Sequence, residues 1–454
     1  MGMLNRFKAK INEIYLDSTI PYNNISKKMV CALKQRITKE DFKTFQKLKK
    51  LKKKQNNLDK KIRIVFLLQM PEVWGKQQIV YEEMKKRDNI ETIIFTIPEY
   101  DIKTGGHKED IAYDYAVKEG LTEIVQSEKN GNWVSLKELQ PDYVFYQRPY
   151  ETYLPEVYRS KNVLEYAKTC YIPYAIFASI SSAMNLEYER GFARNIYYHF
   201  VSNLEMEHLV RHKFSITSKL GLRQVKYLGV PILESVLKTA VKGEDNEVWK
   251  NWGSQQGQLK VLWTPRWTVD EKLGGSHFFH YKDKFTELVR DDKNIYFSFR
   301  PHPMAFDNYV KEKLMSVEQV EKLKKEYAET SNMVIDSHRG YVDTFWGADV
   351  LITDISSMMM EFFVTGKPII FCGTNMALDS LHKEVVGTLY KGNTWQEIAD
   401  ALEQLKSGND YLQEQRSQVI KRWFANMDKT SEKIVDAIVK DYQLSCTTNK
   451  KMIY

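Results

Sequence analysis

A chain of 454 residues with 43% hydrophobic and 13% aromatic residues is long enough for two or three domains and too apolar to be disordered. No apolar run approaches the roughly 20 residues that cross a bilayer, and the amino terminus lacks the apolar segment of a secretion signal, so we expect a cytoplasmic protein. The four cysteines are scattered without a CxxC pair, which argues against a disulfide framework and a structural zinc site.

The first 60 residues are predicted to form a basic helical arm. Residues 1–61 hold seventeen Lys and Arg against five Asp and Glu, whereas the whole chain has a net charge of +8, so the remainder is acidic overall. Within residues 41–54 four apolar residues recur every three positions, as on one face of an amphipathic helix: Phe42, Phe45, Leu48 and Leu51.

Two interpretations of this arm stay open. Its apolar stripe packs on the protein itself, or residues 1–60 attach to an anionic membrane surface. Nucleic acid is not an expected partner, because the rest of the chain has no motif that reads a groove.

An α/β domain is predicted for residues 61–240. It opens at residues 62–68 with a continuous apolar run that suits a buried parallel strand. Further strand-like runs alternate with segments that have a helical pattern, such as 77–86 and 162–168. These runs are 92–97, 143–146, 171–177, 198–202 and 225–228.

A second alternation of strands and helices is predicted for residues 258–430, after a polar, glycine-bearing stretch at 237–258 that we interpret as a connection. Its strand-like runs are 260–263, 295–299, 333–335, 350–353 and 368–372. Two such lobes in tandem indicate an α/β protein with the GT-B-like architecture, in which two Rossmann-like lobes face a cleft. Residues 431–454 form the predicted C-terminal helix and tail, and the helical part near 429–442 could cross back to the first lobe.

The segment 350–371 reads as strand, polar turn, helix and strand. Its turn places Ser356 and Ser357 at a helix start, where free backbone N–H groups and the positive end of the helix dipole suit a phosphate. Glu361, about one and a half turns into the helix, could reach the ribose of a bound nucleotide, and Asp354 is grouped with it as nucleotide-binding. The alternative is ordinary helix capping by Ser and Asp.

Two other segments carry candidate residues. In 296–303 a strand runs into a turn where two prolines restrain His302, a candidate phosphate ligand or general base, and Arg300 offers a donor fork for phosphate. In 262–268 Arg266 is a candidate phosphate ligand, and Trp263 is either core or a surface on which a base stacks. His277 and His280 lie close together in sequence, but no acidic ligand stands nearby, so no metal site is expected.

Taken in this order, the three segments resemble the CDP-glycerol glycerophosphotransferase family, which builds teichoic acids and related phosphopolyol or capsular polymers in bacteria. Residues 262–268 look like its aromatic-x-Pro-x element, 300–303 like its basic-x-His-Pro element, and 353–361 like its Asp-x-Ser-Ser-x-x-x-acid element.

The resemblance implies a GT-B fold, a CDP-linked donor as substrate, and no required cofactor or metal. It also implies peripheral attachment to the inner face of the cell membrane, beside a lipid-linked or polymer acceptor. On the matched positions, His302 lies at the donor diphosphate, Ser356 and Ser357 hold its phosphate oxygens, and Glu361 meets the cytidine ribose.

One departure concerns the catalytic base. Family members of the teichoic polymerase type carry a Trp-His-Gly-Thr-Pro element in the first lobe, and the corresponding strand end, 171–179, has no histidine. Glu72, after the first strand, is the alternative base, and Arg148 in the segment 147–150 supplies another cation. Both residues could equally be structural.

The predicted reaction is attack by an acceptor hydroxyl on the β-phosphorus of a CDP-polyol, with CMP leaving and Arg300, Arg266 and the helix start offsetting the phosphate charge. Two alternatives remain: a GT-B glycosyltransferase that uses a UDP- or GDP-sugar for capsule or exopolysaccharide synthesis, and a non-catalytic scaffold of envelope assembly. The donor polyol, the acceptor and the oligomeric state stay open.

Overall fold

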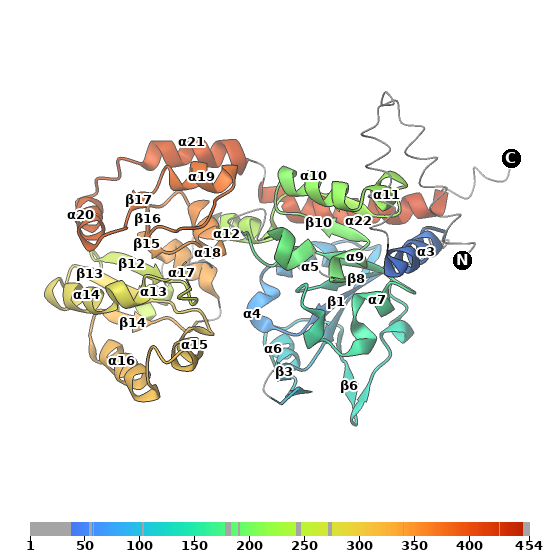
Figure 1. Cartoon of the computed structure of the whole chain (residues 1–454), viewed down its shortest axis with the longest axis horizontal. Helices are drawn as coiled ribbons and strands as arrows, with labels where there is room; N and C mark the ends of the chain where they lie inside the picture. The colour runs from blue at the N-terminus through green and yellow to red at the C-terminus, as the bar shows by residue number, and fades with distance from the viewer. Residues whose placement is uncertain are drawn as a thin grey trace. The chain divides into compact units, whose positions relative to one another are not determined.

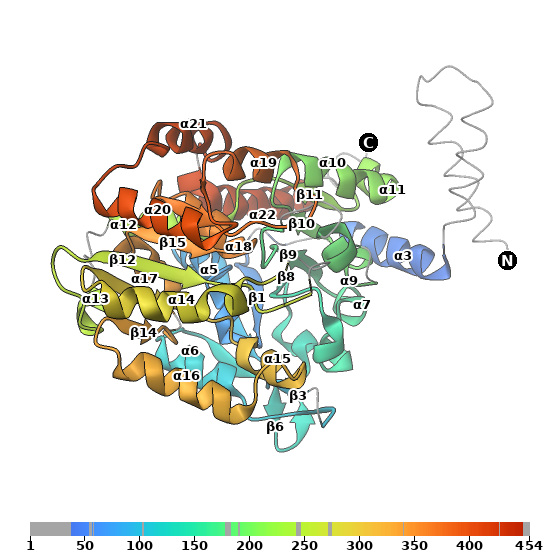
Figure 2. The same ribbon diagram turned by 60° about the vertical axis from the view of Figure 1, so that its left-hand side comes forward.

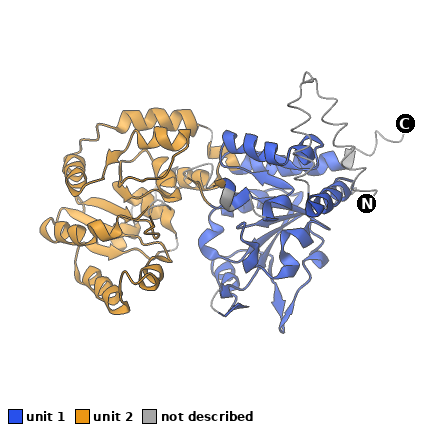
Figure 3. Cartoon of the chain, in the orientation of Figure 1, with its two compact units in different colours: residues 1–174, 184–229, 431–454 blue, residues 175–183, 230–430 orange. Residues whose placement is uncertain are grey.

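The chain folds into two compact units, described here from a computed structural model and drawn in separate colours in Figure 3. Unit 1 comprises residues 1–174, 184–229 and 431–454, and unit 2 comprises 175–183 and 230–430. The structure describes residues 38–53, 57, 59–101, 104–177, 183–188, 191–241, 247–270, 275–338, 340–425 and 427–447. Most of the predicted basic arm, residues 1–37, lies outside the described residues.

Unit 1 is built on a parallel sheet of seven strands in the order β11-β10-β9-β8-β1-β2-β5 (Figure 1). The central strands are apolar throughout because helices cover both faces of such a sheet, which explains the continuous apolar run at residues 62–68. The strands are β1 Ile62–Leu68, β2 Ile90–Thr96, β5 Ile124–Gln126, β8 Tyr143–Tyr146, β9 Lys168–Tyr171, β10 Tyr198–Phe200 and β11 Gln224–Lys226.

Short helices and two antiparallel hairpins complete unit 1. The hairpins are β3 Tyr100–Asp101 with β4 Gly106–His107, and β6 Glu128–Lys129 with β7 Asn132–Trp133. The helices are α3 Lys39–Lys53, α4 Pro71–Trp74, α5 Gln78–Lys85, α6 Ile111–Lys118, η1 Leu136–Leu139, η2 Glu151–Tyr153, η3 Glu156–Tyr158, α7 Ser160–Val163, η4 Met184–Tyr188, α9 Gly191–Arg194, α10 Leu204–Lys213, α11 Ser215–Lys219 and α22 Thr430–Thr447.

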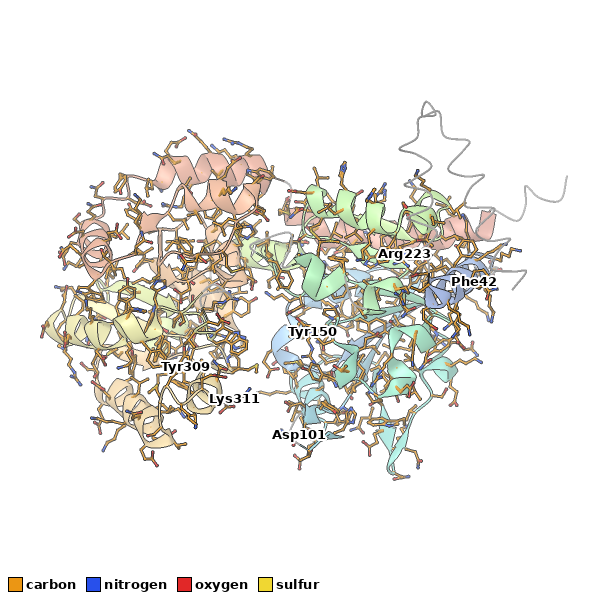
Figure 4. All side chains as sticks on the ribbon, in the orientation of Figure 1. Phe42, Asp101, Tyr150, Arg223, Tyr309 and Lys311 are labelled. Carbon is orange, nitrogen blue, oxygen red and sulfur yellow. The ribbon has the colours of Figure 1, made fainter. Side chains whose placement is uncertain are left out.

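Helix α3, the described part of the basic arm, packs on unit 1 through its apolar stripe. Leu48 is 0% exposed and Leu51 is 4% exposed, and both belong to the core that β1 and α22 also form. Polar contacts reinforce the packing, since Thr44 Oγ1 lies 3.0 Å from Asn195 Oδ1 and Arg194 pairs with Asp41 at 2.7 Å. Of the two interpretations left open, packing on the protein therefore holds for α3, and even its lysines contribute, since Lys47 pairs with Glu165 at 3.1 Å and Lys52 Nζ donates to Leu220 O at 2.8 Å. Figure 4 marks Phe42 on this helix.

Helix α22 returns from the end of unit 2 to unit 1, as the crossing predicted near 429–442 requires. Asp441 accepts hydrogen bonds from the Tyr143 hydroxyl, the Tyr197 hydroxyl and Lys168 Nζ, each at 2.7 Å. Lys168 and Asp441 are almost buried, with 7% and 11% of their side chains exposed. This ion pair joins the last helix to the sheet of the first unit.

Unit 2 repeats the design with a parallel sheet of six strands in the order β14-β13-β12-β15-β16-β17 (Figures 1 and 2). The strands are β12 Leu259–Thr264, β13 Ile295–Phe299, β14 Met333–Ile335, β15 Val350–Thr353, β16 Ile369–Phe371 and β17 Tyr390–Lys391. The helices are α12 Pro231–Val241, α13 Glu247–Asn251, α14 Phe278–Asp291, α15 Ala305–Lys311, α16 Val317–Glu329, α17 Tyr341–Gly347, α18 Ser357–Phe363, α19 Ser380–Val386, α20 Trp395–Lys406, α21 Gln413–Trp423 and η6 Met427–Lys429.

Two stretches differ from the predicted pattern. The helix expected at 162–168 is only α7. The strand expected at 171–177 is β9, which begins earlier because Lys168 finds a buried partner in Asp441. It also ends earlier, because Pro173 has no N–H for the sheet. The polar stretch 237–258 is not a connection, since α13 packs on α17 within unit 2 and Trp249 Nε1 donates to Thr344 O at 3.0 Å. Among the described residues no helix is both long and apolar enough to cross a bilayer.

Candidate functional site

The three segments that the sequence singled out end at one edge of the sheet of unit 2. The strand order reverses between β12 and β15, so their connections leave in opposite directions, and the carboxyl ends at such a switch point are where open α/β sheets bind ligands. Thr264 and Thr353, the last residues of the two strands, are joined there by a hydrogen bond of 2.9 Å. Residues 300–303 follow β13, the strand next to β12.

Asp354 holds the loops of this edge together. Its Oδ2 accepts the backbone N–H groups of Arg266, at 2.7 Å, and His277, at 3.2 Å, while Oδ1 lies 2.6 Å from His277 Nδ1. The residue is 1% exposed. The prediction that Asp354 binds the nucleotide is therefore wrong: it fixes the loop after β12 and the start of α14 against β15.

Arg266 connects the turn before α18 with the loop that bears His302. Its Nη1 donates to Ile355 O at 2.8 Å and its Nε to Thr268 Oγ1 at 2.7 Å. The next residue, Trp267, stacks on the His302 ring with 5.3 Å between ring centroids. No carboxylate of the described residues pairs with Arg266, so its positive charge is available to an anion beside this turn.

His302 presents a single N–H group to an exposed surface. Its Nδ1 accepts the backbone N–H of Met304 at 3.1 Å, so the proton of the neutral ring must sit on Nε2. Crowding by the surrounding protein and, second, the positive charge of Arg266 lower the pKa of His302 to about 4. The ring is therefore neutral near pH 7, where it suits the donation of a hydrogen bond to a phosphate oxygen better than proton abstraction.

Ser356 and Ser357 begin α18, beside the carbonyl that Arg266 holds. Ser356 is the N-cap, and its Oγ accepts the backbone N–H of Met359 at 3.3 Å. A capping hydroxyl accepts through its oxygen and still has a proton to donate. Both serines are half-buried. The structure thus shows the capping role and leaves the predicted role in phosphate binding compatible with it.

Arg300 is committed to a partner that the sequence did not reveal. Its Nη1 lies 2.6 Å from Asp336 Oδ2, and its Nη2 donates to His338 O at 2.7 Å. Phe299 and Ile335 are paired in the sheet, so the residues that follow them come side by side. Arg300 therefore braces the strand end that leads to His302, and its role as a phosphate ligand stays a prediction.

Two other nucleotide-binding predictions are wrong because the side chains are fully buried. Trp263 is 0% exposed and packs among Phe278, Phe285 and Phe299 in the core of unit 2, so it offers no face to a base. Glu361 is also 0% exposed, and its Oε2 accepts a hydrogen bond of 2.5 Å from the Tyr341 hydroxyl. Periodicity in a strand or helix does not tell which face the neighbouring elements cover.

Glu72, the candidate base, belongs to unit 1. It lies on α4, directly after β1, and its side chain is exposed. Arg148, the other candidate from the first lobe, also belongs to unit 1.

One cluster of described residues has the ligand types of a metal site. The ligand atoms of His277, Asp354 and Cys372 lie within 4.8 Å of one another. However, His277 Nδ1 and Asp354 Oδ1 are only 2.6 Å apart, whereas two ligands of a tetrahedral zinc ion would stand about 3.4 Å apart. Burial also raises the pKa of the Cys372 thiol well above its usual value. The short distance between His277 Nδ1 and Asp354 Oδ1 is that of a hydrogen bond, which fixes the start of α14 to the end of β15.

Comparison with known proteins identifies the family. Residues 175–440 match the family model of CDP-Glycerol:Poly(glycerophosphate) glycerophosphotransferase. No curated protein matches the chain significantly.

Solved structures share the fold at low sequence identity. UDP-GlcNAc 2-epimerase from Neisseria meningitidis, bound to UDP-GlcNAc, has a TM-score of 0.55 and 13% identity over 83% of this chain and 100% of its own. S. aureus MnaA in complex with UDP has a TM-score of 0.55 and 12% identity over 85% and 98% of the two chains.

The wall teichoic acid polymerase TagF has a TM-score of 0.52 and 14% identity over 90% of this chain and 98% of its own. At these identities the likeness shows the fold alone, which is GT-B. The family match covers more than half of the chain and contains the whole β12–β15 edge with His302, Arg266 and the paired serines. The chain therefore belongs to the CDP-glycerol:poly(glycerophosphate) glycerophosphotransferase family and is a transferase of that kind.

Proposed function

We propose that the chain moves a polyol-phosphate unit, of the glycerol phosphate or ribitol phosphate kind, from a CDP-linked donor to a hydroxyl of a membrane-associated cell-envelope glycan or polymer. The family match supports a nucleotide-activated donor and a polymer acceptor. The observation that carries the proposal is that Arg266 bonds to the turn before α18 while the next residue, Trp267, stacks on the His302 ring, at the switch point of a Rossmann-like sheet.

In the proposed reaction the acceptor oxygen attacks the β-phosphorus of the donor, the bond from that phosphorus to the bridging oxygen breaks, and CMP leaves. His302 Nε2–H, Arg266 and the hydroxyl groups of Ser356 and Ser357 bind the phosphate oxygens and offset their negative charge. Such preorganised donors supply most of the catalysis in phosphoryl transfer. No cofactor or metal is required in this scheme.

The proton of the acceptor hydroxyl passes to a base, and Glu72 is the proposed base. Its exposed carboxylate follows the first strand of unit 1. The chain has no histidine at the corresponding end of β9, where residues 171–177 provide none.

We propose further that the basic arm attaches the enzyme to the inner face of the membrane. Helix α3 buries its apolar stripe in unit 1 and keeps Lys43, Lys49, Lys50 and Lys53 exposed, so its contribution would be electrostatic. We expect the protein to cosediment with vesicles that contain anionic lipid and not with purely zwitterionic vesicles. Raising the salt concentration to about 1 M should release it, because the Debye length then falls to about 3 Å. Binding that resists salt would refute an electrostatic arm.

Nucleotide selectivity tests the donor class. CDP should raise the melting temperature of the protein more than UDP or GDP at equal concentration, because a ligand that binds only the folded state stabilises it. CMP release from CDP-glycerol and CDP-ribitol would then identify the polyol. Stronger protection by UDP or GDP would favour a glycosyltransferase, and no protection by any nucleotide would favour a non-catalytic scaffold.

A further inference from the structure

Unit 1 has a pocket at the edge that corresponds to the candidate site of unit 2. The strand order of its sheet reverses between β1 and β8, and the pocket lies where these two strands end. Gln69, from the loop after β1, and Gln147, Arg148 and Tyr150, from the loop after β8, are among its lining residues, around a small cavity of about 20 Å³ that is partly open to solvent. Figure 4 marks Tyr150 on unit 1.

Arg148 brings into this pocket a positive charge that forms no ion pair within the described residues. The side chain is half-buried, its Nη2 donates to Gln69 Oε1 at 3.1 Å, and its guanidinium lies over the Tyr153 ring at 5.4 Å. No carboxylate of the described residues forms an ion pair with it, and Gln69 is its one hydrogen-bond partner among them. A guanidinium has five N–H donors, and a withdrawn cation without a counter-charge is unfavourable. An anionic ligand would satisfy both deficits.

The two buried glutamines hold the pocket walls in place before any ligand binds. Gln69 Nε2 donates to Pro98 O at 3.2 Å and to Tyr153 O at 2.7 Å, which turns its Oε1 toward Arg148. Gln147 Oε1 accepts the backbone N–H groups of Gln69, at 2.8 Å, and of Met70, at 3.0 Å. These bonds clamp the loop after β1 to the loop after β8. The cation is therefore preorganised, as a binding site requires.

The proposed base is electrostatically close to this pocket. Burial lowers the pKa of Arg148, and the negative charge of Glu72 is among the influences that partly restore it. Glu72 is two residues beyond the Met70 amide that Gln147 holds. An anion bound to Arg148 would thus bring the rest of its molecule into the neighbourhood of Glu72.

We propose that this pocket binds a phosphate group of the acceptor, as the phosphate ester of a polyol, with Arg148 as its main contact. The planar donor fork matches phosphate oxygens, and a phosphate that neighbours the reacting hydroxyl would hold that hydroxyl near Glu72. That the bound molecule is the acceptor rests on the proposed function. Binding of a polyol phosphate in unit 1 can be measured whether or not the enzyme turns over a CDP-linked donor.

The binding test uses the full chain without any nucleotide. Melting temperatures are measured with glycerol 3-phosphate, inorganic phosphate or glycerol, for the unmodified protein and for Arg148→Ala and Arg266→Ala. We expect glycerol 3-phosphate to protect the unmodified protein best, Arg148→Ala to abolish that protection, and Arg266→Ala to keep it. Protection that survives Arg148→Ala, or that disappears with Arg266→Ala, would place the phosphate in unit 2 and overturn the proposal. So would equal protection by inorganic phosphate, or none by glycerol 3-phosphate.

Two further measurements keep the test decisive. If Arg148→Ala does not fold, Arg148→Lys takes its place. This variant retains the charge and loses the donor fork, and it should weaken glycerol 3-phosphate binding by about tenfold. With turnover in hand, Arg148→Ala should raise the acceptor KM by at least about tenfold and leave the donor KM unchanged. A change in the donor KM alone would contradict the acceptor assignment. A protein that binds glycerol 3-phosphate through Arg148 and turns over no CDP-linked donor would refute the proposed function and not this pocket.

Discussion

His302→Ala should lower kcat for CMP release by about 100- to 1,000-fold, because loss of one preorganised donor to developing charge typically removes about 3–4 kcal/mol of transition-state stabilisation. The structure supplies the reason: the Met304 amide holds Nδ1, so the proton of the neutral ring is on Nε2, and Trp267 stacks on the ring. The measurement is the steady-state rate of CMP release at saturating donor. An unchanged rate would remove His302 from the reaction.

A matched variant separates donation from proton abstraction. His302→Gln carries an amide N–H in place of the imidazole N–H and should recover part of the lost rate, since donation is the role that remains. The pH dependence gives an independent check. The pKa of His302 is lowered to about 4, so the ring gains a proton only as the pH falls through that value, and kcat/KM should show no His302 titration near neutrality. A fall in kcat/KM centred near pH 6.5, the ordinary histidine value, that is absent in His302→Gln would show that the ring acts as a base.

Asp441→Ala should lower the free energy of unfolding of unit 1 by about 3–5 kcal/mol, the usual cost of removing one partner of a buried ion pair. Lys168 would keep its charge with only 7% of its side chain exposed, and the Tyr143 and Tyr197 hydroxyl groups would lose their acceptor. The cation–π contact of Lys168 Nζ with the Tyr197 ring, 4.8 Å from the ring centroid, does not replace the lost ion pair. Urea denaturation followed by tryptophan fluorescence and circular dichroism measures the change.

The same helix provides the control for this prediction. Asp436 pairs with Arg87 at 3.0 Å, and 58% of its side chain is exposed. Asp436→Ala should therefore cost less than about 1 kcal/mol, because solvent screens such a pair. Equal effects of the two substitutions would mean that α22 is not fastened to unit 1 through Asp441.

The apolar runs in the sequence predicted the central strands of both sheets closely. Residues 143–146, 295–299 and 350–353 match β8, β13 and β15, because strands that are buried on both faces admit few polar residues, and residues 333–335 match the edge strand β14. A search for apolar runs missed strand residues that are polar. Lys168 was predicted as the end of a helix, yet it lies in β9, since its charge is neutralised by a residue 273 positions away.

The sequence predicted which loops form the candidate site, but not what each side chain does there. Strand ends followed by Pro, Ser or Arg pointed to residues 264–268, 300–303 and 354–357, and the sheet brings these loops to one edge. The partners of the individual side chains lay beyond sequence reasoning. Arg300 pairs with Asp336 only because β13 and β14 are neighbours in a particular register, and Asp354 is consumed by loops from β12 and α14.

The amino-acid sequence by itself determined the two α/β lobes, the three motifs and the family, since these depend on the periodicity and order of residues along the chain. Only the tertiary structure decided that Trp263 and Glu361 are buried, that α3 and α22 belong to unit 1, and that Arg148 lines a pocket without an ion-pair partner among the described residues. The physical reason is that burial and charge compensation depend on strand order and register, which bring together residues far apart in the chain.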